Sequence, residues 1–290
     1  MPLPTTECFE PYSSDLSDLE WSFLSPLLPI ASRLGRPARY DRRLVLNAIF
    51  YVVRSGCAWR LLPHDLPPWR LCYHYFAFWQ ESGLWEQIND ALRNQVRLLR
   101  GKKKPPALDC FASLTLWAAS GRLSRLARLS THRVLKWANH PGVRGYDAGK
   151  KIRGRKRHLV VDTLGLVLGV AVTAASLSDR AGALEVLPPI LRAHAGLELL
   201  WADAGYAGGT LAADLQAHAA HPDLRLEIIK RSDAAPKGFA VQPRRWVVER
   251  SFGWLMQARR LARDYETKPT SSKAIILAQS IRIMLRSLAK

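Results

Sequence analysis

The first hundred residues carry apolar side chains at the spacing of amphipathic helices, interrupted by residues that start and stop helices. Ser17-Asp-Leu-Glu20 is a capping-box pattern, so we expect a first helix to begin here and to end early at Pro26 and Pro29. Asp41 can cap a second helix, which Gly56 should close. The pattern therefore predicts two short helices before the loop that contains Trp59.

Two more helices are expected before the first linker. The third should extend to Ser82, with Gly83 as its stop, and the fourth should run from Leu84 to about Leu99. Several short helices with tight turns are typical of helix-turn-helix-like DNA-binding modules. A small helical bundle with no role in DNA binding has the same pattern, so both interpretations stay open.

Beyond residue 142 the pattern alternates between β-rich runs and helical periodicity. Two β-rich runs flank an Asp162-Thr-Leu-Gly165 turn and predict a hairpin. The alternation that follows indicates a mixed sheet with helices on its faces. The expected elements are strands at 157–163 and 166–174, a helix at 180–193 interrupted by Pro188-Pro189, a strand at 197–202, a helix at 209–220, a strand at 224–229, and helices at 243–262 and 272–288.

This element order predicts an α/β fold of the RNase H-like class, preceded by a small all-helical, helix-turn-helix-like domain. Gly101-Lys-Lys-Lys-Pro-Pro106 has the composition of a linker. We therefore expect three parts: a helical domain over 1–100, a linker and a segment of unusual composition over 101–141, and an RNase H-like domain over 142–290.

The charge of the chain points to its partner. The 290 residues carry a formal net charge of +19, and phosphate neutralisation makes double-stranded DNA the leading partner. A membrane is not expected, because no run reaches the roughly 18 apolar residues that a span needs. The N-terminus lacks the features of a secretion signal, and the four widely spaced cysteines form no C-x-x-C pair. We expect a cytoplasmic protein with reduced thiols.

Two carboxylates stand out in this basic chain. Asp203 ends an apolar run that reads as a strand, and Glu249 lies in a basic, aromatic-rich stretch that reads as a helix. Carboxylates on different elements can hold two Mg²⁺ or Mn²⁺ ions, which activate the attacking and leaving oxygens of a phosphodiester. Taken singly, Asp203 could instead belong to a turn, and Glu249 could pair with Arg245 on a solvated face.

The strings around these carboxylates resemble those of the DDE transposases, in the IS5 branch of the bacterial IS4/IS5 insertion-sequence group. The resemblance rests on Trp201-Ala-Asp-Ala-Gly-Tyr-Ala207 and on the Arg-x-x-x-Glu spacing that ends at Glu249. Residues 44–85, 142–158 and 234–248 are similar to further segments of that family. The resemblance implies that the helical domain recognises DNA, that the RNase H-like domain is catalytic, and that Asp203 and Glu249 are metal ligands.

The chain departs from this family at the first acidic position. The family carries its first Asp on the first strand, in a string like Asp-Ser-Gln-Ser-Val-Lys, whereas residues 110–140 here contain no Asp or Glu. Asp109 is the nearest candidate for the third catalytic and metal-binding carboxylate. Asp162 and Asp179 are rivals, although a hairpin turn and a helix cap explain them better. The family's Lys seven residues after the Glu is replaced here by Met256.

A compensated pair of frame changes in the gene would explain this stretch of unusual composition. The observation behind this hypothesis is the abrupt return to the family pattern at Gly142. Reading the gene in its other two frames tests it, because one of them should encode an Asp-Ser-Gln-like string near codons 112–135.

Basic residues gather before the predicted hairpin and along the predicted Glu249 helix. A solvated loop would account for the first run, but beside two carboxylates these side chains can clamp DNA phosphates, and Arg binds phosphate in a bidentate manner. The predicted DNA-binding residues are Lys150, Lys151, Arg155, Lys156, Arg157, Arg244, Arg245 and Arg250.

The resemblance implies a transposase that binds terminal inverted repeats and performs metal-dependent strand cleavage and strand transfer, as a homodimer on DNA. Two alternatives stay open. The chain could be an inactive relic that only binds DNA, which would follow if the first Asp is absent. It could also be an RNase H-like nuclease that hydrolyses strands without joining them.

Overall fold

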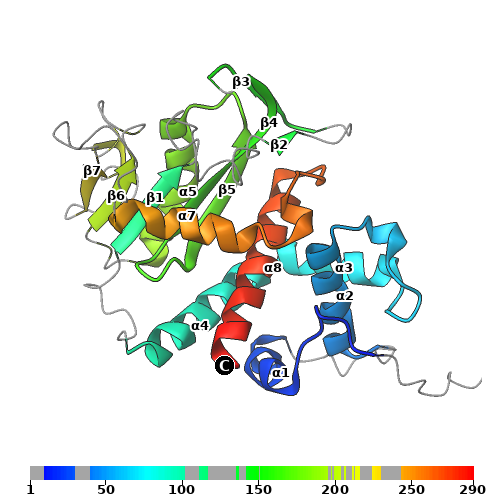
Figure 1. Cartoon of the computed structure of the whole chain (residues 1–290). Coiled ribbons are helices and arrows are strands. Elements are labelled where there is room, and N and C mark those ends of the chain that lie inside the picture. The colour runs from blue at the N-terminus through cyan, green and yellow to red at the C-terminus, as the bar shows by residue number, and fades with distance from the viewer. Residues whose placement is uncertain are drawn as a thin grey trace, which may run out of the picture.

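The computed structural model describes residues 10–29, 40–101, 111–116, 135–136, 142–149, 151–194, 197, 199–203, 206, 211, 213–215, 224–229 and 243–290. For residues 111–116, 135–136, 203, 229 and 243–245 this description covers the backbone alone. The chain forms a helical region and a mixed α/β region, joined by the last helix of the chain (Figure 1).

The helical region confirms the four predicted helices and their boundaries. Ser17 and Glu20 form the expected capping box, and the Asp41 carboxylate accepts a hydrogen bond from the backbone N–H of Arg43. Gly56 closes its helix in the left-handed conformation, with φ of 76°. The helices are α1 (Asp18–Leu24), α2 (Arg42–Ser55), α3 (Trp69–Glu81) and α4 (Leu84–Leu99), with short 3₁₀ turns η1 (Ser25–Leu27) and η2 (Trp59–Leu61).

The predicted hairpin and strands form one mixed sheet. The hairpin strands β4 (Ile152–Val161) and β5 (Val167–Ala174) pair in antiparallel fashion. On its other side β4 pairs antiparallel with β1 (Phe111–Leu116), and β1, β6 (Leu199–Asp203) and β7 (Arg225–Ile229) follow one another in parallel. The short strands β2 (Leu135–Lys136) and β3 (Gly145–Asp147) extend β4. The strand order β5-β4-β1-β6-β7, with helices on both faces, is the RNase H-like arrangement that we predicted.

Helices cover opposite faces of this sheet, and the side chains of β4 alternate between two cores. Val160 belongs to the core under α5 (Asp179–Ala193), whereas Leu159 and Val161 belong to the core that includes Phe252 of α7 (Pro243–Leu255). Figure 1 shows α7 crossing the sheet in front and α5 behind it. The face under α7 therefore meets the same core as the helical region.

The last helix, α8 (Pro269–Leu288), connects the two regions. It packs against α4, α2 and α1 on one side and against β5 on the other. Its side chains are buried over most of its length. Arg282 of α8 forms an ion pair of 2.7 Å with Glu20 of α1, and both side chains are buried.

Two local predictions need correction. Helix α5 continues through Pro188 and Pro189 without the predicted interruption, because Leu187, Ile190 and Leu191 are buried against the sheet and hold the helix there. Helix α7 ends at Leu255 rather than continuing to residue 262. A turn and the 3₁₀ segment η4 (Arg259–Leu261) follow, and they bring the chain back against α2.

Two further segments were predicted less clearly. Residues 209–220 lie largely outside the described residues, although 211 and 213–215 are helical. The segment 101–141 contains β1, a central strand of the sheet, which we had assigned to no element.

Candidate functional site

The candidate site begins at the carboxyl end of β6, where Asp203 is the last residue of the strand. Ala202 of β6 pairs with Leu114 of β1, so the next step along both parallel strands places Thr115 beside Asp203. On the other side Asp203 pairs with Ile229 of β7. Neighbouring strands lie about 4.8 Å apart, so the backbones of Thr115 and Asp203 are direct neighbours in the sheet.

Glu249 comes from α7, which packs against β1 and β4. Val248 and Phe252 of this helix are buried in the core, and Glu249 itself is half-buried. The Ser251 hydroxyl donates a hydrogen bond of 2.7 Å to the carbonyl of Gly165, which fastens the helix to the hairpin turn. The structure therefore brings the Glu249 helix onto the strand that adjoins Asp203.

The third predicted carboxylate, Asp109, lies outside the described residues, and its role stays a prediction. Phe111, the first residue of β1, pairs with Leu199, four residues before Asp203 in β6. At about 3.3 Å per residue, that start of β1 is already roughly 13 Å along the strand from the level of Asp203.

The sequences of β1 and β6 do not supply the remaining carboxylate of a three-carboxylate metal site. Strand β1 reads Phe-Ala-Ser-Leu-Thr-Leu, which offers hydroxyl groups but no carboxylate beside Asp203. Among the residues whose side chains the structure describes, no three His, Cys, Asp or Glu side chains lie close enough to hold a metal ion. Two predicted ligands therefore lie on suitable elements, and a third is missing from the adjacent strand.

The two rival aspartates have structural roles. The buried Asp162 carboxylate accepts hydrogen bonds from the backbone N–H groups of Leu164 and Leu166 within the hairpin turn, and it forms an ion pair of 2.9 Å with Arg97. Asp179 lies in the first turn of α5, one residue after the Ser178 cap. Its carboxylate is 3.3 Å from the Lys156 ammonium.

Three of the predicted DNA-binding residues are buried in β4. Arg155 donates to the carbonyls of Val143, Glu266 and Thr267, and it lies 3.4 Å from the Asp264 carboxylate. The other two, Lys156 and Arg157, donate to the carbonyls of Leu177 and Leu261. Burial lowers the pKa of Arg157 to about 10. These side chains hold the strand in place, so we do not propose them as DNA contacts.

The remaining basic residues are placed in different ways. Lys151 is exposed, whereas Lys150 is outside the described part of the chain. Arg244 and Arg245 lie in the first turn of α7, where only their backbone is described. Arg250 is half-buried, donates a hydrogen bond of 2.9 Å to the carbonyl of Leu164, and lies between the rings of two tryptophans of α7.

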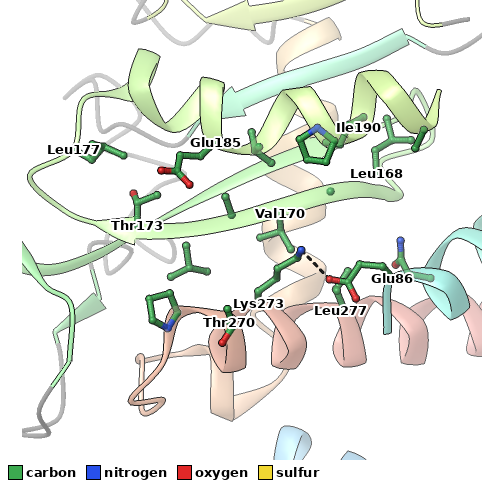
Figure 2. A pocket seen from close by; sticks show the side chains of 18 of the residues that line it. Glu86, Leu168, Val170, Thr173, Leu177, Glu185, Ile190, Thr270, Lys273 and Leu277 are labelled. Carbon is green, nitrogen blue, oxygen red and sulfur yellow. Dashed lines mark ion pairs between the residues drawn. The ribbon is translucent and has the colours of Figure 1, made fainter. Parts of the chain in front are cut away.

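One cavity is separate from the carboxylate site. Figure 2 shows this cavity of about 730 Å³, which lies along the edge strand β5 between α5 and α8. An ion pair of 2.8 Å between Lys273 and Glu86 crosses one side, and Glu185 points in from the other. Strand β5 is separated from β6 by β4 and β1. With carboxylates on its walls, this cavity is a poor match for a polyanion.

The sequence did not reveal a second cavity, of about 570 Å³, where arginines from four helices meet. Arg54, Arg100 and Arg286 lie far apart in the sequence, on α2, at the end of α4 and on α8. Their convergence depends on the packing of the helices.

Comparison with known proteins finds a family match in each half of the chain. Residues 16–89 match the family described as "Putative transposase of IS4/5 family", and residues 125–284 match the family described as "Transposase DDE domain". The second match begins after β1, so the strand without a carboxylate lies outside both matched ranges.

Two curated relatives are similar to the helical part of the chain. One is the "Insertion element IS402 uncharacterized 16.2 kDa protein" of Burkholderia cepacia, 28% identical over 88 residues that cover 28% of this chain and 60% of the relative. The other is the "Uncharacterized protein y4sN" of Sinorhizobium fredii, 29% identical over 83 residues that cover 29% of this chain and 66% of the relative. The chain thus spans less than two thirds of either relative. No solved structure gives a significant match.

Proposed function

The chain belongs to the IS4/IS5-family DDE transposases, and from this premise we propose that it binds the terminal inverted repeats of an insertion element. In this proposal the helical region recognises the repeat, and the α/β region acts on the phosphodiester at its end. Asp203 and Glu249 are the proposed active-site carboxylates, and double-stranded DNA is the substrate.

One observation carries the proposal. Asp203 ends β6 directly beside β1, and the helix that carries Glu249 packs on β1. Strand ends of this kind converge at one edge of the sheet, where acidic side chains from separate elements can act on one phosphate. The net charge of +19 supports a polyanionic substrate, since exposed cations neutralise backbone phosphates.

Divalent ions in such a site stabilise the charge on the attacking and leaving oxygens of the phosphodiester. The residues of this chain supply two carboxylates toward that role, and the position beside Asp203 in β1 supplies a hydroxyl-bearing residue instead. We therefore propose that binding of the repeat is retained and that strand cleavage is limited by the missing third carboxylate.

A second candidate function follows from the same strand. A chain that binds the repeats without cutting them would be a DNA-binding relic of a transposase. The absence of a carboxylate from the sequence of β1 favours this candidate. A nuclease that cuts without joining strands stays open as well, and the absence of a strand-transfer product would identify it.

Binding and nicking of the same DNA test the proposal. A labelled duplex that ends in the element's own terminal repeat is incubated with Mg²⁺ or Mn²⁺ and with the wild-type chain, Glu249→Gln, or Glu185→Gln. Glu185 is an exposed carboxylate of α5, away from the candidate site, and serves as the matched control. All three proteins should bind the repeat more tightly than a scrambled duplex.

The nicking result then separates the candidates. Any metal-dependent nicking by the wild-type chain should be lost in Glu249→Gln and kept in Glu185→Gln, which identifies the enzyme. Specific binding without nicking by any of the three proteins identifies the relic. No preference for the repeat over the scrambled duplex would contradict the proposed function itself.

A further inference from the structure

A cavity of about 570 Å³ lies where α2, α4, α7 and α8 meet the β4–β5 turn. Its wall is apolar in part, with Phe50, Val96 and Trp254 among the lining residues. None of the described residues that line it is Asp or Glu. Six of the lining residues are cationic: Arg54, Arg100, Arg250, Arg282, Arg286 and Lys290.

The most buried of these six cations is Arg282, whose side chain is 8% exposed. One terminal nitrogen donates to the Glu20 carboxylate at 2.7 Å, and the other donates to the carbonyl of Asp15 at 2.7 Å. Its Nε is buried and has no acceptor in the structure. A buried donor without an acceptor is costly, and the Arg282 donor belongs to a residue that lines the cavity.

Arg250 repeats this arrangement from the side of α7. Its Nη2 donates to the carbonyl of Leu164, while its Nε is also buried without an acceptor. Burial lowers the pKa of Arg250, although the charge of Asp162 opposes the shift. Burial likewise lowers the pKa of Arg286, and the neighbouring Arg282 charge adds to this effect. The positive charge around the cavity therefore exceeds the negative charge of the nearby carboxylates, Glu20 and Asp162.

The mouth of the cavity carries exposed arginines with free donor capacity. Arg54 donates to the carbonyl of Gln257 at 2.6 Å, Arg100 to the hydroxyl of Ser287 at 3.3 Å, and Arg286 to the carbonyl of Ser13 at 2.9 Å. A guanidinium carries five N–H donors, so each of these side chains can fix its position and still bind an anion.

We propose that this cavity is a binding site for a phosphate-bearing anion, with Arg100 and Arg286 as exposed donors and the buried charges of Arg282 and Arg250 adding to the attraction. Guanidinium groups match the oxygens of phosphate in pairs, and a site with this many cations fits a multiply charged ligand. The phosphate could come from the backbone of DNA, in which case the inference rests on the proposed function. It could also come from a free polyphosphate or nucleotide.

Inorganic tripolyphosphate is a suitable probe, and calorimetry measures its affinity and stoichiometry in the absence of DNA. The test variant is Arg100→Gln/Arg286→Gln, and Arg100→Lys/Arg286→Lys keeps the charge. The control, Arg192→Gln/Arg225→Gln, removes two exposed charges from α5 and β7, outside the cavity. A thermal melt of each variant without ligand checks its fold. The salt concentration is about 0.15 M, so that interactions between distant exposed charges are screened.

The wild-type chain should bind one tripolyphosphate, and the double Gln variant should lose at least about tenfold in affinity, since two charge-assisted contacts disappear. The double Lys variant should lose less, and the control should keep wild-type affinity. Equal affinity of the wild-type and double Gln chains, or an equal loss in the control, would overturn the proposal.

A competition experiment distinguishes the two sources of phosphate. If DNA supplies the ligand, tripolyphosphate displaces a bound duplex, and the double Gln variant loses a similar factor in DNA affinity. If the ligand is free, tripolyphosphate binds equally well to the protein–DNA complex. Failure to bind the terminal repeat would contradict the proposed function and leave the tripolyphosphate result standing.

Discussion

Cations in this protein have two different roles, and burial separates them. Arg155 is fully buried, and its guanidinium donates to three backbone carbonyls from segments that are distant in the sequence. Arg153, two residues earlier on the same strand, is exposed. A run of basic residues therefore does not by itself indicate a DNA-contact surface. The groups that bury Arg155 come from segments whose position beside β4 the sequence does not predict.

His158 is a buried titratable residue between β4 and α5. Its Nε2 lies 2.7 Å from the hydroxyl of Thr173, and its ring contacts the position where a Cβ of Gly182 would be. Burial lowers the pKa of His158 from 6.5 to about 4, and the Lys156 charge adds to the shift. The imidazole is therefore neutral at pH 7 in the folded chain.

We predict that the free energy of unfolding falls as the pH is lowered from about 6.5 toward 4. The unfolded chain binds a proton in this range that folded His158 does not, so protonation favours unfolding. At pH 5 the shifted pKa of His158 should lower the free energy of unfolding by about 2 kcal/mol relative to pH 7. Urea unfolding at pH 7 and pH 5 measures the effect. His158→Gln should show a smaller loss between the two values than the exposed control His64→Gln. Equal losses of unfolding free energy in both variants would contradict the assignment of this pH dependence to His158.

At the level of elements, local signals predicted the helices of the first hundred residues because their caps lie within a few residues of the helix ends. Ser17, Asp41 and Gly56 each act through one or two neighbouring backbone groups. Helix α5 and strand β1 depend on distant contacts instead. Burial of α5 against the sheet overrides its two prolines, and β1 is a strand only because β4 and β6 pair with it on either side.

Replacing a glycine by alanine should destabilise the protein at Gly182 of α5 and stabilise it at Gly253 of α7. In Gly182→Ala the added methyl group would overlap the His158 ring, so we expect a loss of about 1–3 kcal/mol in unfolding free energy. In Gly253→Ala on α7 nothing lies near the added methyl group, so the better helix propensity of Ala should add about 0.5–1 kcal/mol. Urea denaturation of the two variants measures both changes. A Gly182→Ala chain as stable as the wild type would show that α5 does not pack on His158 as described.

At the scale of the whole molecule, α8 makes the helical and α/β regions one unit. It contacts helices of the first and β5 of the second, and the ion pair of Arg97 with Asp162 links α4 to the hairpin turn. None of the helices in the described parts of the chain is both long and apolar enough to cross a membrane. The arginine-lined cavity exists only in this assembled form, which explains why no single segment of the sequence predicted it.

The candidate site was only partly predictable from the sequence, because it too depends on how distant segments pack together. Asp203 and Glu249 stand in strings specific enough to be recognised, and the structure places their elements against β1. The third position could not be assigned from the sequence, because its neighbour in space is set by the strand register. That register identifies Thr115 as the residue beside Asp203.

Restoring a carboxylate at that position tests the account most directly. Metal-dependent nicking of the terminal-repeat duplex is compared for the wild-type chain, Thr115→Asp, the uncharged control Thr115→Asn, and Thr115→Asp combined with Glu249→Gln. We predict that Thr115→Asp raises the nicking rate at least about tenfold, as expected for completing a metal site, and that the other two variants show no gain. If the wild-type chain nicks efficiently and Thr115→Asp brings no gain, the third ligand lies elsewhere and the account of this site is contradicted.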